Sequence, residues 1–574
     1  MSTDSPSERA KRFAGSVLPV TEWLPAYDRS WLRTDLVAGI TVAAAVIPEG
    51  LAYASLAGLP PQTGLYAALM GAATYVFFAS SRQVLLGPTS ALAILLLAGV
   101  GPIADGSELS YPALVTVTTV LVGVIAVAAR VFRLGHLVSF ISGSVLTGFS
   151  TGAALYIIST QLGKLLGISG SEGTFFERVW FVLVNLNEAQ AATVAVGLIS
   201  IALLLLGERY VPRLPTALVV VLLAIVASSV LNFQAWGVEI VGELPGGLPS
   251  LTVPSIPSIP VLGALFPVAF ALFLLSYVEG IGAVQTFARR NGYRADPDQE
   301  LLADGVGNVA AGLFGGFVVG GSMSRSALND SMGGKSQVVS AVMALVLVVV
   351  LLFLTGLFTT LPDATLGAIV AVAALGLVDV AGMERLRSVS RSEFVIASAA
   401  LLGVLAVGIV WGVFIGVGLS LLHTISLASS PKTEVLGRIP DTDHFVNLGS
   451  YPEAVEDPGV LVYRVDAGLF YANTNVVRED LEARVEGRDS PLDLVVFDLS
   501  SSPIVDFAGA EFLGELRSDL ASRGIDLRVA GANAQVTELL AAAGLDGELG
   551  GVREDERIAS AIDRWRREEE EETS

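Results

Sequence analysis

Two short, polar-capped segments in an otherwise apolar chain carry the residue types best suited to bind an anion. Gly87-Pro88-Thr89-Ser90 leads into an apolar piece at 88–100, and Gly321-Ser322-Met323-Ser324-Arg325 opens a piece at 322–334. A helix of about 12 residues reaches only halfway across the hydrocarbon core, so its amino end lies near the midplane. That end has unpaired N–H groups and the positive pole of the helix dipole. Thr89, Ser90, Ser322 and Ser324 can cap such ends or donate to an oxyanion, so two ends facing each other would form an anion site.

Arg325 lies in the first turn of the second short segment. A guanidinium at the bilayer midplane costs on the order of 3 kcal/mol and is tolerated where it faces a cavity or an anionic partner. We therefore assign Arg325 to the anion site. The alternative is that Arg325 reaches the interface or only forms an ion pair with Asp330 or Glu279.

Two carboxylates also lie within apolar runs, Glu49 after Pro48 and Glu279 before Gly280. Removal from water favours the protonated form of a carboxyl group. Glu279 is therefore the candidate proton-coupling residue, because proton uptake would offset its repulsion of an incoming anion. Glu49 is assigned to the anion site, with the alternative that it caps backbone groups where Pro48 breaks the first helix. Tyr53, one turn later, is expected to bond to substrate or to Glu49.

Long apolar runs must position these residues, and a span needs about 20 apolar residues. Full spans are predicted near 36–58, 63–80, 111–131, 137–163, 191–207, 215–233, 261–288, 337–358, 364–380, 392–408 and 410–427. Short or glycine-broken pieces at 88–100, 301–318 and 322–334 bring the total to fourteen. An even number places both termini on one side, and the Arg and Lys excess in the loops of that side predicts that both are cytoplasmic.

The first seven elements and the second seven share a layout, over about 35–233 and 261–427. Each half begins with an element that carries an acidic residue beside glycine, and its third element is a short one. An odd number of spans per repeat makes the two halves inverted in the membrane. Paired short segments in corresponding positions point to a midplane substrate site of a secondary transporter.

The chain has 574 residues, 53% of them hydrophobic and 16% charged, with a net charge of −21. From Ser429 onward, 14 Arg or Lys face 31 Asp or Glu, so this part carries 17 of the 21 excess negative charges. Such an acidic region is a poor partner for nucleic acid. The rest is nearly neutral and apolar, as expected of a chain dissolved in lipid.

Past Pro431 the pattern becomes that of a small α/β domain. Strands are predicted at 459–466, 493–499 and 525–530, and amphipathic helices at 474–486 and 508–522; their alternation indicates a sheet covered by helices. We expect a cytoplasmic segment at 1–34, a transmembrane domain at 35–430, a soluble domain at 441–565 and a solvated, disordered acidic tail at 566–574.

Catalytic and metal chemistry find little support in the sequence. The chain has no cysteine, and His136, His423 and His444 are too scattered for a metal cluster. An enzyme that used Glu49 and Glu279 as acid and base would need a nucleophile or metal that the sequence does not offer. We therefore expect no enzymatic activity, no metal and no cofactor.

The run PEGLAYASLAGLPPQTGLYAAL at 48–69 resembles one signature of the sulfate permease (SulP) family, which includes solute carrier family 26, and residues 296–337 resemble its second signature. The soluble part is similar to the STAS domain of these transporters. The resemblance implies fourteen helices in two inverted repeats, with a core domain (helices 1–4 and 8–11), a gate domain (5–7 and 12–14) and a homodimer.

The resemblance also implies roles for individual residues. It places the anion between the amino ends of helices 3 and 10, here Pro88-Thr89-Ser90 and Ser324-Arg325, and it matches Glu279 to the helix 8 acid of proton-coupled members. Two positions depart from the pattern. Glu49 stands where the signature often has Gln. Asp506-Phe507-Ala508-Gly509 lacks the Ser or Thr that follows the Asp in related anti-sigma antagonist proteins, so phosphorylation is not expected there.

The residues and the resemblance together lead to one functional expectation. We expect secondary active uptake of an oxyanion, sulfate by proton symport, through elevator-like motion of the core against the gate in the cell membrane. Bicarbonate or a C4-dicarboxylate such as succinate is the alternative substrate. An uncoupled anion exchanger or channel is the alternative mechanism.

Overall fold

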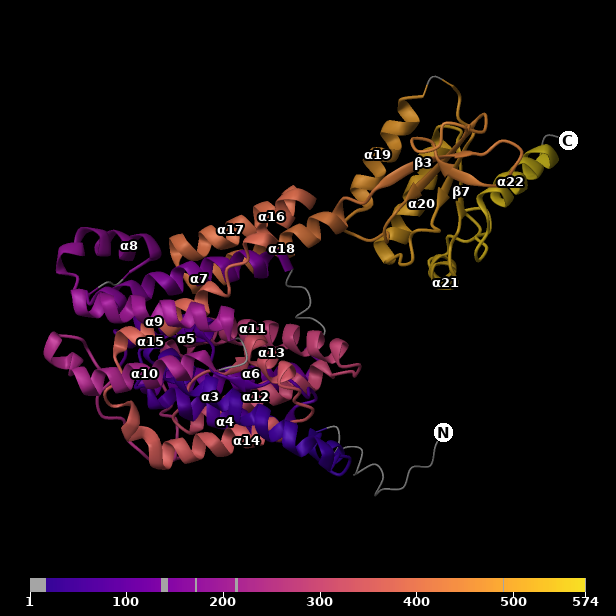
Figure 1. Ribbon diagram of the computed structural model, residues 1–574. Coiled ribbons are helices and arrows are strands. Elements are labelled where there is room, and N and C mark those ends of the chain that lie inside the picture. The colour runs from indigo at the N-terminus through magenta and orange to yellow at the C-terminus, as the bar shows by residue number, and fades with distance from the viewer. Residues whose placement is uncertain (1–16, 136–142, 171–172, 212–214, 489, 573–574) are drawn as a thin grey trace. The chain divides into compact units, whose positions relative to one another are not determined.

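The computed structural model describes residues 17–135, 143–170, 173–211, 215–488 and 490–572 (Figure 1). The chain forms two compact units, 1–420 and 421–574. In the described part, the first unit is almost entirely helical, and the second contains a five-stranded sheet covered by helices.

The first unit follows the apolar runs of the sequence. Its helices are α2 (Val20–Trp23), α3 (Leu32–Leu56), α4 (Gln62–Phe78), α5 (Ser90–Ala104), α6 (Tyr111–Val131), α7 (Gly143–Leu166), α8 (Phe175–Val184), α9 (Ala191–Tyr210), α10 (Thr216–Leu231), α11 (Ile259–Arg290), α12 (Pro297–Leu313), α13 (Met323–Ser331), α14 (Val338–Val349), α15 (Asp363–Leu375), α16 (Val380–Val389), α17 (Arg391–Val407) and α18 (Ile409–Ser429). In the described ranges, eight helical segments are long and apolar enough to cross a membrane, and α5 and α10 are shorter apolar helices.

Three elements differ from the sequence-based prediction. Helix α3 runs without interruption through Pro48, so the alternative in which this proline breaks the helix and Glu49 caps the freed backbone groups is wrong. Helix α12 begins at Pro297 rather than 301, because Asp296 accepts hydrogen bonds from the Asp298 and Gln299 amides at its amino end. The span predicted at 137–163 begins, within the described residues, at Gly143, and His136 lies outside them.

Two very short strands connect the halves of the first unit. Strand β1 (Leu86–Gly87) pairs antiparallel with β2 (Gly320–Gly321), with Leu86 opposite Gly321 and Gly87 opposite Gly320. Helix α5 follows β1, and α13 follows β2. The pairing therefore sets the amino ends of the two short helices at one place.

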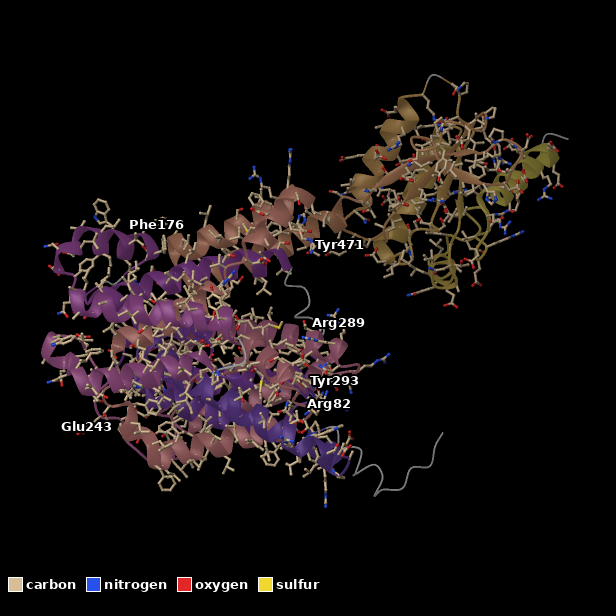
Figure 2. All side chains as sticks on the ribbon, in the orientation of Figure 1. Arg82, Phe176, Glu243, Arg289, Tyr293 and Tyr471 are labelled. Carbon is tan, nitrogen blue, oxygen red and sulfur yellow. The ribbon has the colours of Figure 1, made fainter. Side chains whose placement is uncertain are left out.

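Three charged residues mark the two ends of the first unit. Arg82 and Arg289 lie toward one end of this unit, and Glu243 lies at the other (Figure 2). Arg82 follows α4, and Arg289 is in the last turn of α11.

The second unit is a mixed sheet with strand order β4-β3-β5-β6-β7. Its strands are β3 (Thr433–Arg438), β4 (Phe445–Asn447), β5 (Val460–Val465), β6 (Leu494–Asp498) and β7 (Asp526–Ala530). Strands β5, β6 and β7 are parallel, whereas β3 runs antiparallel to β4 and β5. The helices are α19 (Thr474–Glu486), α20 (Phe507–Ser522), α21 (Ala534–Ala542) and α22 (Ile558–Glu572).

Alternation along the strands fills a core on each face of the sheet. Leu461, Tyr463 and Val465 pack in a cluster with residues of α19, α20 and α21. Val460 and Val462 belong to the opposite cluster, which α22 covers. The strands and helices predicted for this unit lie within one or two residues of their predicted bounds.

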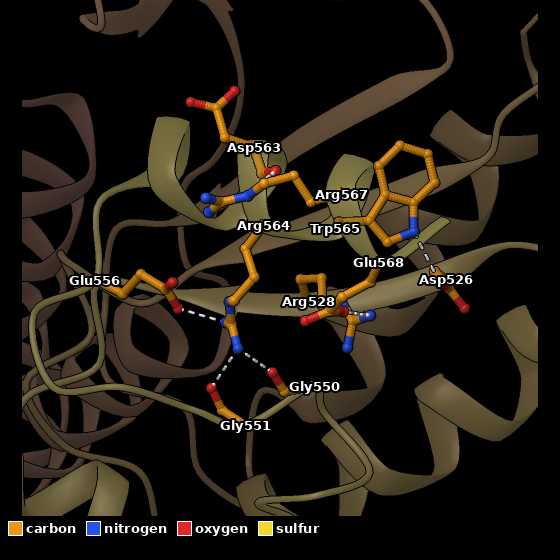
Figure 3. A network of polar contacts seen from close by, with 10 residues as sticks. All are labelled: Asp526, Arg528, Gly550, Gly551, Glu556, Asp563, Arg564, Trp565, Arg567 and Glu568. Atoms are coloured by element: carbon orange, nitrogen blue, oxygen red, sulfur yellow. Dashed lines mark hydrogen bonds and ion pairs between the residues drawn. The ribbon is translucent and has the colours of Figure 1, made fainter. Parts of the chain in front are cut away.

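The acidic end of the chain is helical, so the prediction that 566–574 is disordered is wrong as far as Glu572. Helix α22 buries Ala561 and Ile562 against the sheet. Arg528 forms an ion pair with Glu568 at 2.7 Å, and the Trp565 indole N–H donates to Asp526 at 2.8 Å (Figure 3). These contacts order a segment whose composition alone suggests a solvated tail.

Candidate functional site

Two helix amino ends meet around the β1–β2 pair. At α5, the Thr89 hydroxyl accepts from the Leu92 amide at 3.3 Å, and at α13 the Ser322 hydroxyl accepts from the Arg325 amide at 3.5 Å. Both helices thus begin with the hydroxyl caps expected from the sequence. Ser90 is buried at the start of α5, whereas Ser324 is exposed at the start of α13.

Arg325 joins the two short helices. Its side chain is only 2% exposed, and its Nη1 donates to the Pro88 carbonyl oxygen at 2.6 Å. Its Nη2 donates to the Gly320 carbonyl oxygen at 3.4 Å. The guanidinium lies against Gly87, where an added Cβ would be 3.2 Å from Nη1. Among the described residues its Nε is buried without a hydrogen-bond partner. Arg325 therefore supplies a positive charge directly behind the meeting point of the helix ends.

Glu49 and Tyr53 of α3 lie beside this arginine. The Glu49 carboxylate is 3.9 Å from Nη1 of Arg325. Tyr53 is buried, and its phenol is close enough to Ser90 and Glu49 to interact with both. The sequence-predicted residues of the first half thus converge with Arg325 of the second half.

Glu279 reaches the same place from α11. The backbone of α11 approaches β2 so closely that a Cβ on Gly321 would be 2.7 Å from the Gly280 Cα. Glu279 interacts electrostatically with Arg325. One guanidinium thus lies 3.9 Å from the Glu49 carboxylate and within the electrostatic influence of Glu279, and these three groups carry a net charge of −1 when both carboxylates are ionised.

The predicted alternative of an Arg325–Asp330 pair is wrong. Asp330 instead forms an ion pair with Arg290 at 3.1 Å and accepts from the Asn291 side chain at 2.8 Å. The two residues are five positions apart on α13, so they lie on different faces of the helix. Arg325 is left to face the short strands and Glu49.

Several polar residues of α11 and α12 that hold the site were not predicted from the sequence. The Ser276 hydroxyl donates to Asp304 at 2.8 Å and to the Val319 carbonyl at 3.0 Å. The Asn308 side chain donates to the Val319 carbonyl and accepts from the Val319 amide. These contacts fix the residue that precedes β2 and thereby position Arg325. The signal was present, because Glu300, Asp304 and Asn308 recur every four residues in a broken apolar run, which places them on one helix face.

Comparison with known proteins identifies the family. Residues 32–400 match the model of the sulfate permease family, and residues 451–561 match the STAS domain. A probable sulfate transporter of Mycobacterium tuberculosis is 37% identical over 524 residues, which cover 91% of this chain and 93% of that protein. The chain belongs to the sulfate permease family. The high affinity sulfate transporter 1 of Stylosanthes hamata is 30% identical over 93% of this chain and 84% of its own length.

Solved structures agree with the expected fold of this sulfate permease homologue. The murine solute carrier 26 member A9 anion transporter, in its inward-facing state, superposes with a TM-score of 0.88 at 25% identity, covering 98% of this chain and 95% of that one. The transmembrane domain of the cyanobacterial bicarbonate transporter BicA has a TM-score of 0.60 at 22% identity, covering 69% and 98%. The predicted polytopic helical fold with an α/β STAS domain is confirmed, and the family is one of membrane anion transporters.

The STAS domain lacks a hydroxyl residue directly after Asp506, where related anti-sigma antagonist proteins have Ser or Thr. Asp506 caps α20, where its carboxylate accepts from the Gly509 amide at 2.8 Å and from the Tyr471 amide at 3.1 Å. Phe507 and Ala508 follow it. The position after the Asp therefore holds a phenyl group rather than a hydroxyl.

Proposed function

We propose that this sulfate permease homologue takes up sulfate by proton symport. The anion would be held between the first turns of α5 and α13. Ser90 and Ser324 would donate hydroxyls, Tyr53 and Glu49 would flank the anion from α3, and Arg325 would supply the positive charge. The sulfate transporters named above support this choice of substrate, since they align with nearly the whole chain.

The observation that carries the proposal is the placement of Arg325. A guanidinium that is 98% buried and bonded to two backbone carbonyls cannot leave the protein interior, so its charge is a fixed part of the site. The positive poles of two helix dipoles add to this charge, which favours a small, doubly charged oxyanion over a neutral solute.

The two carboxylates provide a reason for proton coupling. With Glu49 and Glu279 ionised, the site is net negative, and a divalent anion would add to that charge. A proton on Glu279 removes one negative charge next to the bound anion, so the two would bind together better than either alone. Coupling of this kind is a difference in affinity between the protonated and deprotonated carrier.

The proposed carrier spans the cell membrane fourteen times in two inverted repeats and has both termini in the cytoplasm. Helices α3–α6 and α11–α14 would form the core domain, and α7, α9, α10, α15, α17 and α18 the gate domain. The core would carry the anion across by an elevator-like motion in a homodimer. The chain has no cysteine of its own. Cysteine pairs introduced between the core domain and the gate domain could therefore be crosslinked selectively, and their crosslinking would detect this motion.

A proteoliposome uptake panel tests substrate and coupling together. Radiolabelled sulfate, bicarbonate and succinate would each be offered with an inward proton gradient, an inward sodium gradient or neither. The proposal expects sulfate accumulation with the proton gradient alone. Accumulation of bicarbonate or succinate in its place would assign the alternative substrate, and equilibration without accumulation would indicate an exchanger or channel.

A further inference from the structure

A second cavity lies away from the proposed anion site, at the end of the first unit where Arg82 and Arg289 are found (Figure 2). It measures about 440 Å³. Its walls come from the N-terminal segment 19–31, from 79–82 after α4, from 294–299 at the start of α12 and from 335–337 after α13. A cavity of this size is within the range of small-molecule sites.

The cavity combines cationic side chains with aromatic rings. Arg82, Arg294 and Lys335 line it, and none of them forms an ion pair with another described residue. Two indoles, of Trp23 and Trp31, line it from the N-terminal segment. Guanidinium groups suit bidentate binding of phosphate, and an exposed ammonium adds a point charge.

Acidic residues weaken this charge only in part. The Asp296 carboxylate is occupied as the cap of α12, where it accepts from the Asp298 amide at 2.9 Å. Glu22 lies on α2 at the opposite wall. The lining therefore keeps an excess of one positive charge, with its cations on the loops between helices.

Two buried polar atoms of the lining have no partner in the described structure. They are the indole Nε1 of Trp23 and the side-chain oxygen Oε1 of Gln299. Gln299 is only 3% exposed, and its amide nitrogen donates to the Phe78 carbonyl at 2.7 Å, which fixes its orientation. A buried donor and acceptor left unpaired are costly, and a polar ligand in the cavity would relieve that cost.

The walls are held in place without a ligand. Asp35 accepts from Tyr27 at 3.1 Å, from the Lys335 amide at 2.7 Å and from the Ser336 hydroxyl at 2.7 Å. This buried carboxylate therefore ties the N-terminal segment, α3 and the loop after α13 together. The N-terminal wall and the 335–337 wall of the cavity are therefore joined by one buried carboxylate.

We propose that this cavity binds a phosphate group of a larger ligand, with Arg82 and Arg294 on the phosphate and the indoles against the rest of the molecule. Either an anionic lipid headgroup or a soluble nucleotide has this chemistry. Leu24 and Leu32, which are exposed and adjoin Trp23 and Trp31 in sequence, suit a lipid source, and the indoles suit a nucleobase. The site is separate from the transported anion, because none of its residues contacts Arg325.

Binding to the purified full-length chain in nanodiscs distinguishes the sources. One arm measures equilibrium binding of radiolabelled ATP in neutral phosphatidylcholine nanodiscs, with inorganic phosphate as competitor. The other measures phosphatidylglycerol retained by the protein in native mass spectrometry. The site variant is Arg82→Gln with Arg294→Gln, and the charge-matched control is Arg289→Gln with Arg387→Gln, two exposed arginines outside the cavity.

We expect saturable binding of one of the two probes, weakened at least about tenfold in the site variant and changed less than about twofold in the control. Binding of ATP that phosphate displaces assigns a nucleotide, and retention of phosphatidylglycerol assigns a lipid. The proposal is overturned if the wild-type chain binds neither probe, or if the control variant weakens binding as much as the site variant.

Discussion

The Nη1 atom of Arg325 donates to the carbonyl oxygen of Pro88 at 2.6 Å. The donor belongs to the second short helix, and the acceptor lies just before the first. A residue of the second repeat is therefore bonded to the backbone that precedes the short helix of the first repeat. This bond makes the geometry of the proposed anion site depend on both halves of the chain.

Replacement of Arg325 by Lys should abolish most transport while the protein still folds. An ammonium keeps the charge but cannot bond to the Pro88 and Gly320 carbonyls at once. Loss of these charge-assisted bonds, about 3 kcal/mol together, corresponds to roughly a 100-fold fall in uptake. Initial uptake rates in proteoliposomes measure it, with Arg289→Lys as the control. Uptake within about twofold of wild type would mean that charge alone suffices.

Replacement of Gly321 by Ala should impair transport through the backbone. Its Cβ would be 2.7 Å from the Gly280 Cα, so β2 and α11 would have to move apart. We expect a destabilisation of about 1–3 kcal/mol and a marked loss of uptake. Gly282→Ala is the matched control, because Gly282 lies on α11 with open space around it. This variant should leave stability and uptake unchanged. Equal effects of the two variants in thermal unfolding would contradict the close approach.

Replacement of Ser324 by Ala should weaken anion affinity without loss of stability. The hydroxyl is exposed at the amino end of α13 and is 3.3 Å from the Ser322 hydroxyl, which is the helix cap. One neutral hydrogen bond is worth about 1 kcal/mol, so KM should rise about fivefold. Ser331→Ala, at the other end of the same helix, should leave KM unchanged. An unchanged KM for Ser324→Ala would remove this residue from the site.

The STAS domain should lose stability at acid pH through Asp480. Burial acts to raise the pKa of this carboxyl, but hydrogen bonds from Arg484, Thr433 and Tyr463 hold the pKa below its ordinary value. A depressed folded-state pKa contributes stability above the unfolded value of about 3.9, and this contribution is lost as the pH falls through the folded value.

Hydrogen exchange of α19 in the full-length chain measures this effect. Protection, corrected for the intrinsic rate, should decrease below about pH 4 in the wild type. Asp480→Asn should show lower protection at neutral pH and a flatter dependence on acid. Parallel curves for the two proteins would assign the acid sensitivity to other groups.

The sequence allowed the fold, and most of the residues that the structure brings together around β1 and β2, to be predicted, because both depend on local patterns. Apolar run length located the long helices, and the hydroxyls before 88–100 and 322–334 located the caps. The partner of Arg325 was not predictable, since it depends on the two-residue pairing of β1 with β2, which is too short to leave a pattern. Asp330 is near Arg325 in sequence but faces Arg290 in space.

Two other differences have local causes. Pro48 suggested a helix break, yet the helix continues, because membrane helices tolerate proline where packing satisfies the freed backbone groups. The run Glu568–Glu572 suggested disorder, yet it extends a helix anchored by Ile562 and Trp565. In both cases tertiary contacts outweighed a composition signal.

Proton-driven sulfate uptake by wild type and Glu279→Gln tests the central claim most directly. The two proteins would be reconstituted in parallel, and radiolabelled sulfate would be followed with and without an inward proton gradient. The account predicts accumulation above equilibrium by the wild type, and only gradient-independent equilibration by Glu279→Gln, whose side chain cannot exchange a proton. Equal accumulation by both proteins, or no response of the wild type to the gradient, would contradict it.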